Sequence, residues 1–344
     1  MRVLLPILLL ALTACAAPLP IPVSAPIPDA SLHDIKVVTT QTRDPDDPAL
    51  FGGERSDVLN YGSVTVSIPP VHETGNIEWP GRTPDASQHF VVTEAGQYPD
   101  FRALDRALPR APETIVFVHG YNTTVLEAAF HFAQIREDFE LDVPSVLFAW
   151  PSAGDVRGYL YDRDSVLFSR LDLAQTIRDL SRRGDVLIVA HSMGSLLAME
   201  AMRHLAVTGD RRTLSKISAV TLVAPDIDKD VFVRQARAIG TLPDPFLIFV
   251  AQTDRALRLS SFLTGREERL GNLSSAEDIG DLPIAVFDLT SLGSETGLNH
   301  QIALESPAAI QLLKQVTDAG PEALDLLAPF LVNQSTQQRA AAGG

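Results

Sequence analysis

Val189-Ala190-His191-Ser192-Met193-Gly194-Ser195 decides the fold, because this stretch joins a predicted strand to a predicted helix. The strand is the apolar run 185–190, and apolar residues with helical spacing follow over 193–205. A serine at such a junction occupies a tight turn that lifts its Oγ above the sheet. The usual pattern is Gly-x-Ser-x-Gly, and Ala190 replaces the first glycine by the next smallest residue. Ser192 is therefore a candidate nucleophile, the alternative being a serine that only caps its helix.

The same alternation of strand and helix patterns extends on both sides of this stretch. Continuous apolar runs are typical of strands buried on both faces, and their alternation with helices predicts a parallel sheet with right-handed crossovers. We therefore predict the α/β class, with a mostly parallel open sheet flanked by helices and a β-rich opening part over 33–95. The expected strands are 61–69, 89–93, 114–118, 145–150, 185–190, 217–224, 246–251 and 283–289, and the expected helices are 124–139, 165–183, 193–205, 229–238 and 301–316.

A second string, Phe117-Val-His-Gly-Tyr-Asn122, also ends a strand and precedes a helix. Together with the Ser192 turn it resembles the α/β-hydrolase superfamily, and more narrowly the bacterial α/β-hydrolases long described as a domain of unknown function. The resemblance covers roughly residues 50 to 315 and implies little about the natural substrate. The other strings that carry it are Glu54-Arg55 through Tyr61-Gly62, Val66-Ser-Ile-Pro69, His72-Glu-Thr-Gly75, Ala149-Trp-Pro-Ser152, Ala224-Pro-Asp-Ile-Asp228 and the stretch 253–257.

The resemblance implies an oxyanion hole at these two strand ends. In this superfamily the loop after the earlier strand supplies one N–H, and the residue after the nucleophile supplies the other. The donors here would be the backbone amides of Tyr121 and Met193. His119 is expected to be a structural histidine of the loop and not a base.

The order of a hydrolase triad along the chain is serine, acid, histidine. His300 follows the last predicted strand and is the expected base, since His204 lies inside the helix after Ser192. The acid has two candidates, because Asp254 and Asp226 both follow strands whose carboxyl ends meet at one edge of the sheet. Asp254 is the first choice and Asp226 the second. The candidate not used would tie a loop or cap a helix, as Asp228 is expected to do.

These residues predict a serine hydrolase that cleaves carboxylic esters of small-molecule or lipid-like substrates through an acyl-enzyme. Two alternatives stay open: acyl transfer or amide cleavage with the same triad, and an inactive binding or scaffold protein on a hydrolase fold. No cofactor is expected, and no His, Asp or Glu cluster has the spacing of a metal site. The net charge of −15 argues against nucleic acid as a partner.

The first residues predict a location in the bacterial cell envelope. Residues 1–14 have the pattern of a signal peptide, and Leu12-Thr-Ala-Cys15 resembles a lipobox, so Cys15 is the expected site of lipid attachment. Ala16 after it favours the outer membrane, with the protein tethered on the periplasmic side. Residues 15–32 form a Pro-rich tether, 33–332 the hydrolase domain and 333–344 a flexible tail. A lid over 255–282 is a further expectation, as is an entrance lined by Tyr159 and Tyr161.

Overall fold

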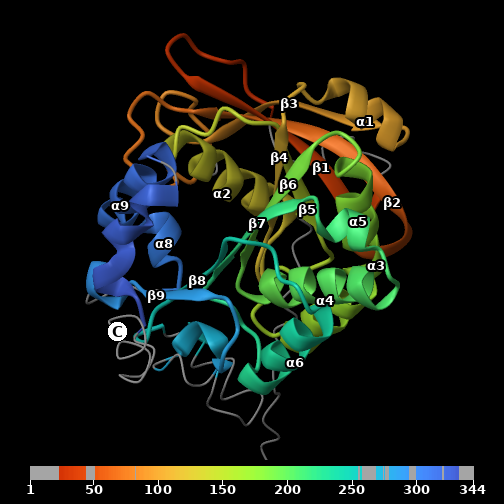
Figure 1. The fold of residues 1–344 in the computed structure, drawn as a ribbon. Helices are drawn as coiled ribbons and strands as arrows, with labels where there is room; N and C mark the ends of the chain where they lie inside the picture. Colours follow the sequence, from red (N-terminus) through yellow and green to blue (C-terminus); the bar gives the residue numbers. More distant parts are fainter. Residues whose placement is uncertain are drawn as a thin grey trace, which may run out of the picture.

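The computed structural model describes residues 23–43, 51–81, 83–254, 256–257, 269–273, 275, 279–293, 300–319 and 321–332, without the side chains of 317–324. One nine-stranded sheet forms the centre of the described structure (Figure 1). Its strands are β1 (Ser31–Arg43), β2 (Phe51–Ile68), β3 (Val91–Tyr98), β4 (Glu113–Val118), β5 (Ser145–Ala149), β6 (Asp185–His191), β7 (Ile217–Val223), β8 (Phe246–Val250) and β9 (Ala285–Asp288).

The strand order places the predicted site elements beside one another. The order is β3-β2-β1-β5-β4-β6-β7-β8-β9; β1 and β4 to β9 run parallel, and β2 is antiparallel to both of its neighbours, β1 and β3. β4 pairs with β6 in register from Glu113–Asp185 to Val118–Ala190. The loop after β4 and the turn after β6 are therefore neighbours at the carboxyl edge, where open α/β sheets bind ligands.

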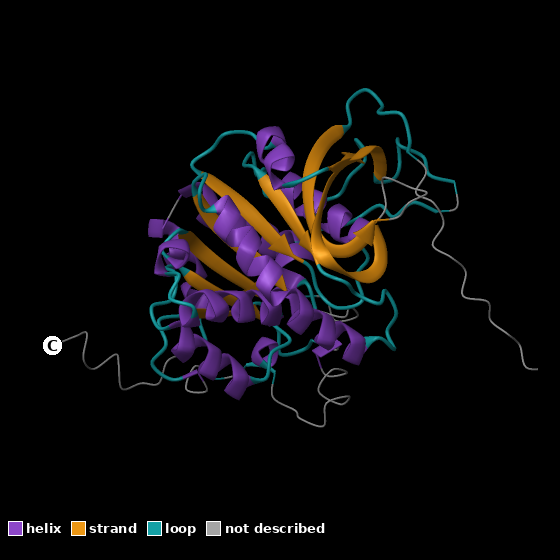
Figure 2. Cartoon of the chain, turned by 90° about the vertical axis from the view of Figure 1, so that its right-hand side faces the viewer, coloured by secondary structure: helices purple, strands orange, loops and turns teal. Residues whose placement is uncertain are grey.

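Helices cover both faces of the sheet (Figure 2). On one face lie α3 (Tyr159–Leu180), α4 (Met193–Val207) and α6 (Lys229–Ile239), whose apolar side chains join one core cluster. On the other face lie α2 (Val125–Asp138), α8 (Ile302–Glu305) and α9 (Pro307–Ala319), which join a second cluster. Because both faces are covered, the parallel strands have no polar side to present, which explains their continuous apolar runs.

The described residues also form shorter elements, namely α1 (Phe101–Ala107), α5 (Arg211–Leu214), η1 (Leu270–Asn272), η3 (Thr290–Leu292) and η4 (Pro321–Phe330). The fold class and the β-rich opening part are as predicted, and the pairings within that part are antiparallel. The predicted helix 301–316 was wrong in one respect, because it is divided into α8 and α9 at Ser306. Ser306 has ψ 118° and precedes Pro307, and a residue before proline disfavours helical backbone.

Candidate active site

Ser192 occupies a strained turn between β6 and α4. Its φ is +52° and its ψ −121°, a region that non-glycine residues rarely adopt. The turn is fixed by backbone hydrogen bonds: the Ser192 amide donates to the Val223 carbonyl at 2.9 Å, and the Ser192 carbonyl accepts from the Asp226 amide at 3.1 Å. Such strain persists only where the surroundings impose it, and it is common at functional sites.

Two glycines allow the close packing around this turn. A Cβ on Gly194 would lie 2.3 Å from the His119 carbonyl oxygen, so α4 begins in direct contact with the end of β4. A Cβ on Gly120 would lie 2.7 Å from His191 Nδ1 and 3.0 Å from the Ser192 Cβ. The two sequence strings therefore meet in space, and neither glycine can carry a side chain without moving the other strand end.

Asp254 and His300 are brought together across 46 residues of chain. His300 Nδ1 lies 2.6 Å from Asp254 Oδ2, and the Asp254 side chain is fully buried. The other carboxylate oxygen of Asp254 accepts the Leu257 amide at 2.9 Å. An Asp254 carboxylate accepts the proton of Nδ1, which leaves Nε2 as the basic nitrogen of the ring. Among the described hydrogen bonds none joins Ser192 Oγ to His300, a contact that often tightens only with substrate bound.

His191 links the Ser192 turn to His300. The rings of His191 and His300 meet edge to face, with centroids 4.8 Å apart. Burial lowers the pKa of His191 well below its usual value, so this ring is neutral at pH 7. A neutral neighbour avoids repelling a positive charge that forms on His300.

Asp226, the second candidate acid, is engaged elsewhere. Its Oδ1 lies 3.3 Å from Arg269 Nε, and its Oδ2 accepts the Tyr159 hydroxyl at 3.0 Å. The side chains of Asp226 and Arg269 are both at least 97% buried. Asp226 therefore ties the segment after β7 to η1 and α3, and Asp228 caps α6 as expected, accepting the amides of residues 230 and 231.

The loop that carries Tyr121 is held by a buried carboxylate that sequence reasoning missed. Asp162 accepts the amides of Asn122 at 3.0 Å and Ala153 at 2.7 Å, together with the Ser152 hydroxyl at 2.7 Å. Burial is the largest influence and raises the pKa of Asp162. Among the described hydrogen bonds none has the Tyr121 or Met193 amide as donor, which leaves both N–H groups available. The sequence string Ala149-Trp-Pro-Ser152 was the available signal for this contact, because its Ser152 donates to Asp162.

His119 has the structural role expected for it. Its ring stacks on Trp150 at 4.8 Å, Nε2 accepts the Trp150 amide, and Nδ1 donates to the Gly120 carbonyl. Burial lowers its pKa to about 4, so the ring is neutral at pH 7. These bonds join the ends of β4 and β5 beneath the Tyr121 loop.

Other expectations fare differently. Tyr159, the first residue of α3, does not line an entrance, because its side chain is 4% exposed and packs edge-on against Tyr121. Tyr161 is exposed and lies under the Arg55 guanidinium.

Residues 258–268 of the expected lid lie outside the described residues, as do Cys15 and the segments 1–14 and 333–344. None of the described helices is both long and apolar enough to cross a bilayer.

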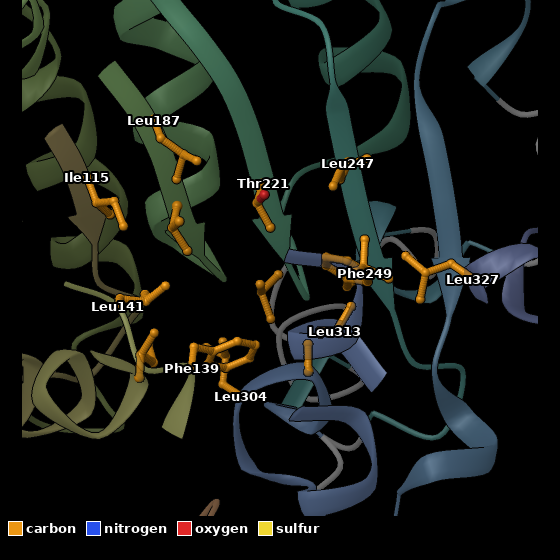
Figure 3. Close-up of a pocket in the computed structure, with 15 residues that line it drawn as sticks. Ile115, Phe139, Leu141, Leu187, Thr221, Leu247, Phe249, Leu304, Leu313 and Leu327 are labelled. Atoms are coloured by element: carbon orange, nitrogen blue, oxygen red, sulfur yellow. The ribbon is translucent and has the colours of Figure 1, made fainter. Parts of the chain in front are cut away.

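An apolar groove lies on the sheet face that α2 and α9 cover (Figure 3). Its cavity volume is about 180 Å³, and Thr221 is its single polar lining residue. Neither Ser192, Asp254 nor His300 lines it. It reaches α8 through Ala303 and Leu304, two residues that also follow His300 closely along the chain. We assign no catalytic role to it.

The parallel sheet, the strained serine turn at its carboxyl edge and the histidine that follows the last strand define an α/β-hydrolase. The chain belongs to the family described as alpha/beta hydrolase of unknown function (DUF900), whose model matches residues 103–316. No curated protein matches the chain.

Solved structures with related folds were also found. One is a fungal esterase from Rhizomucor miehei, with 12% identity, a TM-score of 0.37, and coverage of 90% of this chain and 87% of that one. A putative hydrolase of the alpha/beta superfamily from Xanthomonas campestris has 18% identity and a TM-score of 0.30, covering 59% and 99%. Phospholipase PlaB from Legionella pneumophila has 13% identity and a TM-score of 0.36, covering 66% and 65%.

Proposed function

We propose that the protein is a serine hydrolase that cleaves carboxylic esters through an acyl-enzyme. Ser192 is the nucleophile, His300 the general base, Asp254 the residue that orients it, and the Tyr121 and Met193 amides form the oxyanion hole. The observation that carries the proposal is the 2.6 Å contact between a fully buried Asp254 and His300, formed at the same sheet edge as the strained Ser192 turn.

The reaction follows from these positions. His300 Nε2 takes the Ser192 proton as Oγ attacks the ester carbonyl, and the developing oxyanion is stabilised by the two free amides. The imidazolium then gives that proton to the departing alcohol. Water, activated by the same nitrogen, releases the acid and restores the serine. The buried carboxylate of Asp254 stabilises the imidazolium in both halves of the cycle.

Labelling with a fluorophosphonate probe tests the activated serine. The probe is attacked by Ser192 Oγ, and fluoride leaves. Wild-type protein without residues 1–14 is expected to be labelled, and Ser192→Ala is not. Ser195→Ala is the matched control, because its hydroxyl is bonded to the Ala190 carbonyl at 3.1 Å and has no role in the reaction. A folded wild type that stays unlabelled, with and without detergent micelles, would favour the binding-protein alternative.

A panel of esters with graded acyl length, beside thioesters and amides, then assigns the substrate class. Hydrolysis of esters with Ser192-dependent turnover supports the proposal. Transfer of the acyl group to an added alcohol in preference to water would instead indicate an acyltransferase, since both reactions use the same acyl-enzyme.

We also propose that the mature protein is anchored in the cell envelope through a lipid on Cys15, on the periplasmic side of the outer membrane. The support is the sequence of the first 15 residues. Metabolic labelling with an alkyne fatty acid is expected to mark the wild type and to spare Cys15→Ser. Recovery of the wild type in the soluble periplasmic fraction would contradict the anchor.

A further inference from the structure

His72 lies at the centre of a buried charged cluster on the sheet face that α2 and α8 cover. Its Nδ1 is 2.9 Å from Glu78 Oε2, its Nε2 is 3.1 Å from Asp138 Oδ1, and its side chain is 10% exposed. A neutral imidazole has one donor nitrogen, so the second would face a carboxylate with a lone pair. The ring is therefore doubly protonated and holds two carboxylates, one from its own loop and one from the end of α2.

The cluster reaches α8 by two routes. Asp138 Oδ2 accepts the Gly75 amide at 2.8 Å and a bond from the Gln134 side-chain amide, and Gln134 also donates to the Leu304 carbonyl at 2.9 Å. Gly75 has a φ of +84°, and a Cβ on it would lie 2.1 Å from the Glu305 carbonyl oxygen. The loop after β2 thus touches Glu305, and α2 is bonded to Leu304, the last two residues of α8.

α8 is one turn long and begins two residues after His300. Within the helix the amides of Leu304 and Glu305 donate to the Gln301 carbonyl, the residue directly after His300. A shift of this turn therefore moves the residue next to His300. The imidazole must stay aligned with Asp254 on one side and Ser192 on the other, and such alignment is sensitive to displacements of about 1 Å.

We infer that the cluster of His72, Glu78, Asp138 and Gln134 is a positioning device, which holds α8 and thereby sets His300 for the reaction. This inference rests on the proposed function. It gives the string His72-Glu-Thr-Gly75 a role in catalysis although the string lies 228 residues before His300 in the chain. His72 and its partners are positioning residues, because none of them touches the reacting atoms.

The titratable groups that face His72 come from its own loop, from α2 and from β1. Glu78 belongs to the loop, Asp138 to α2 and His33 to β1. The two bonded carboxylates raise the pKa of His72 to about 9, although burial opposes this rise. The cluster is thus intact at pH 7 and loses its cation when the pH rises past about 9.

The test compares the rate of covalent labelling, kinact, and the probe affinity, KI, in three variants and a control. Gln134→Leu removes the bond to Leu304, Gly75→Ala inserts a Cβ against Glu305, and His72→Gln removes the cation. The matched control is His33→Gln, because His33 is bonded to Glu137 of the same helix at 2.7 Å but has no described contact with α8. Thermal unfolding shows which variants fold.

Folded Gln134→Leu is expected to lower kinact about tenfold with KI changed less than about twofold, and His33→Gln to match the wild type. In the wild type and in His33→Gln, kinact falls as the pH rises past about 9. In Gln134→Leu this fall is smaller, because only the Gly75 contact with Glu305 still joins the cluster to α8. A role in stability alone would move the unfolding temperature and leave both readouts unchanged.

Two results overturn the inference. If folded Gln134→Leu and Gly75→Ala label at the wild-type kinact with the wild-type pH profile, the cluster does not position His300. If the wild type itself is not labelled, the proposed function fails, and with it the reason to position His300. Should His72→Gln not fold, the two uncharged substitutions decide the question alone.

Discussion

Asp226 and Arg269 form an ion pair that is almost completely buried, and the backbone amide of Asp226 donates to the Ser192 carbonyl at 3.1 Å. The pair also holds the Tyr159 hydroxyl, and Tyr159 packs against Tyr121. Asp226 thus holds Tyr159 against Tyr121, whereas Asp254 contacts His300. The two aspartates follow neighbouring strands, β7 and β8, yet their side chains have different partners.

Replacing the two aspartates should separate these roles. Asp254→Asn is expected to lower kcat for an ester by about 10³- to 10⁴-fold with a nearly unchanged unfolding temperature, because the amide cannot hold the imidazole in its reactive tautomer. Asp226→Asn should instead destabilise the fold by about 3–5 kcal/mol, since it removes the carboxylate of a buried ion pair. Steady-state kinetics and urea unfolding of both variants provide the measurement. A larger loss of kcat in folded Asp226→Asn would reverse the assignment of the acid.

Gly194→Ala is expected to cost activity and stability together. The new Cβ would lie 2.3 Å from the His119 carbonyl and 2.6 Å from that of Val118, both in the backbone of the neighbouring strand end. Overpacking of this kind costs about 1–3 kcal/mol, and the Ser192 turn and the Tyr121 loop must move apart to relieve it. Gly53→Ala is the control, because nothing lies within 4 Å of its Cβ position. Equal labelling rates in both variants would contradict this account.

The parts of the site that the sequence predicted are those with local causes. The Ser192 turn follows from a strand, a small residue and a helix within seven positions, and the helix expected over 124–139 is α2. Pro307 also indicates the break between α8 and α9. We predicted a single helix there because apolar residues have helical spacing on both sides of Pro307.

The remaining parts depend on contacts between distant segments. The sequence ranks Asp254 above Asp226, but both follow apolar strands, and the local pattern does not show which aspartate contacts His300 and which contacts Arg269. The start of α3 was missed because its buried residues include Asp162, a carboxylate that hydrophobic periodicity cannot reveal. Its burial is explained only by the amides and the hydroxyl that it accepts.

Asp162→Asn should therefore weaken catalysis without touching the reacting groups. An amide side chain cannot accept from two amides and a hydroxyl as a carboxylate does, so the loop that carries Tyr121 should loosen. We expect kcat to fall about 10- to 100-fold, since loss of one oxyanion donor costs about 10²- to 10³-fold, with a smaller change in KM. Asp164→Asn, two residues further along α3 and exposed, is the control. Unchanged kcat in Asp162→Asn would mean that the loop does not depend on this carboxylate.

His72 should make the stability of the fold depend on pH in the alkaline range. Its pKa is raised from 6.5 to about 9 in the folded protein, so the folded state keeps a proton that the unfolded chain loses. The stabilisation is complete below pH 6.5 and is lost as the pH rises to about 9, for a total of about 3 kcal/mol. Urea unfolding of the wild type at pH 6, 7.5 and 9.5 should show this decline, and in His72→Gln the decline should be smaller by that amount. His33→Gln should keep the wild-type slope between pH 7.5 and 9.5, because burial lowers the pKa of His33 and its ring is neutral there in both the folded and the unfolded chain. Parallel curves of stability against pH for the wild type and His72→Gln would show that His72 is not charged in the folded protein. That result would contradict the proposal that a His72 cation holds the cluster together.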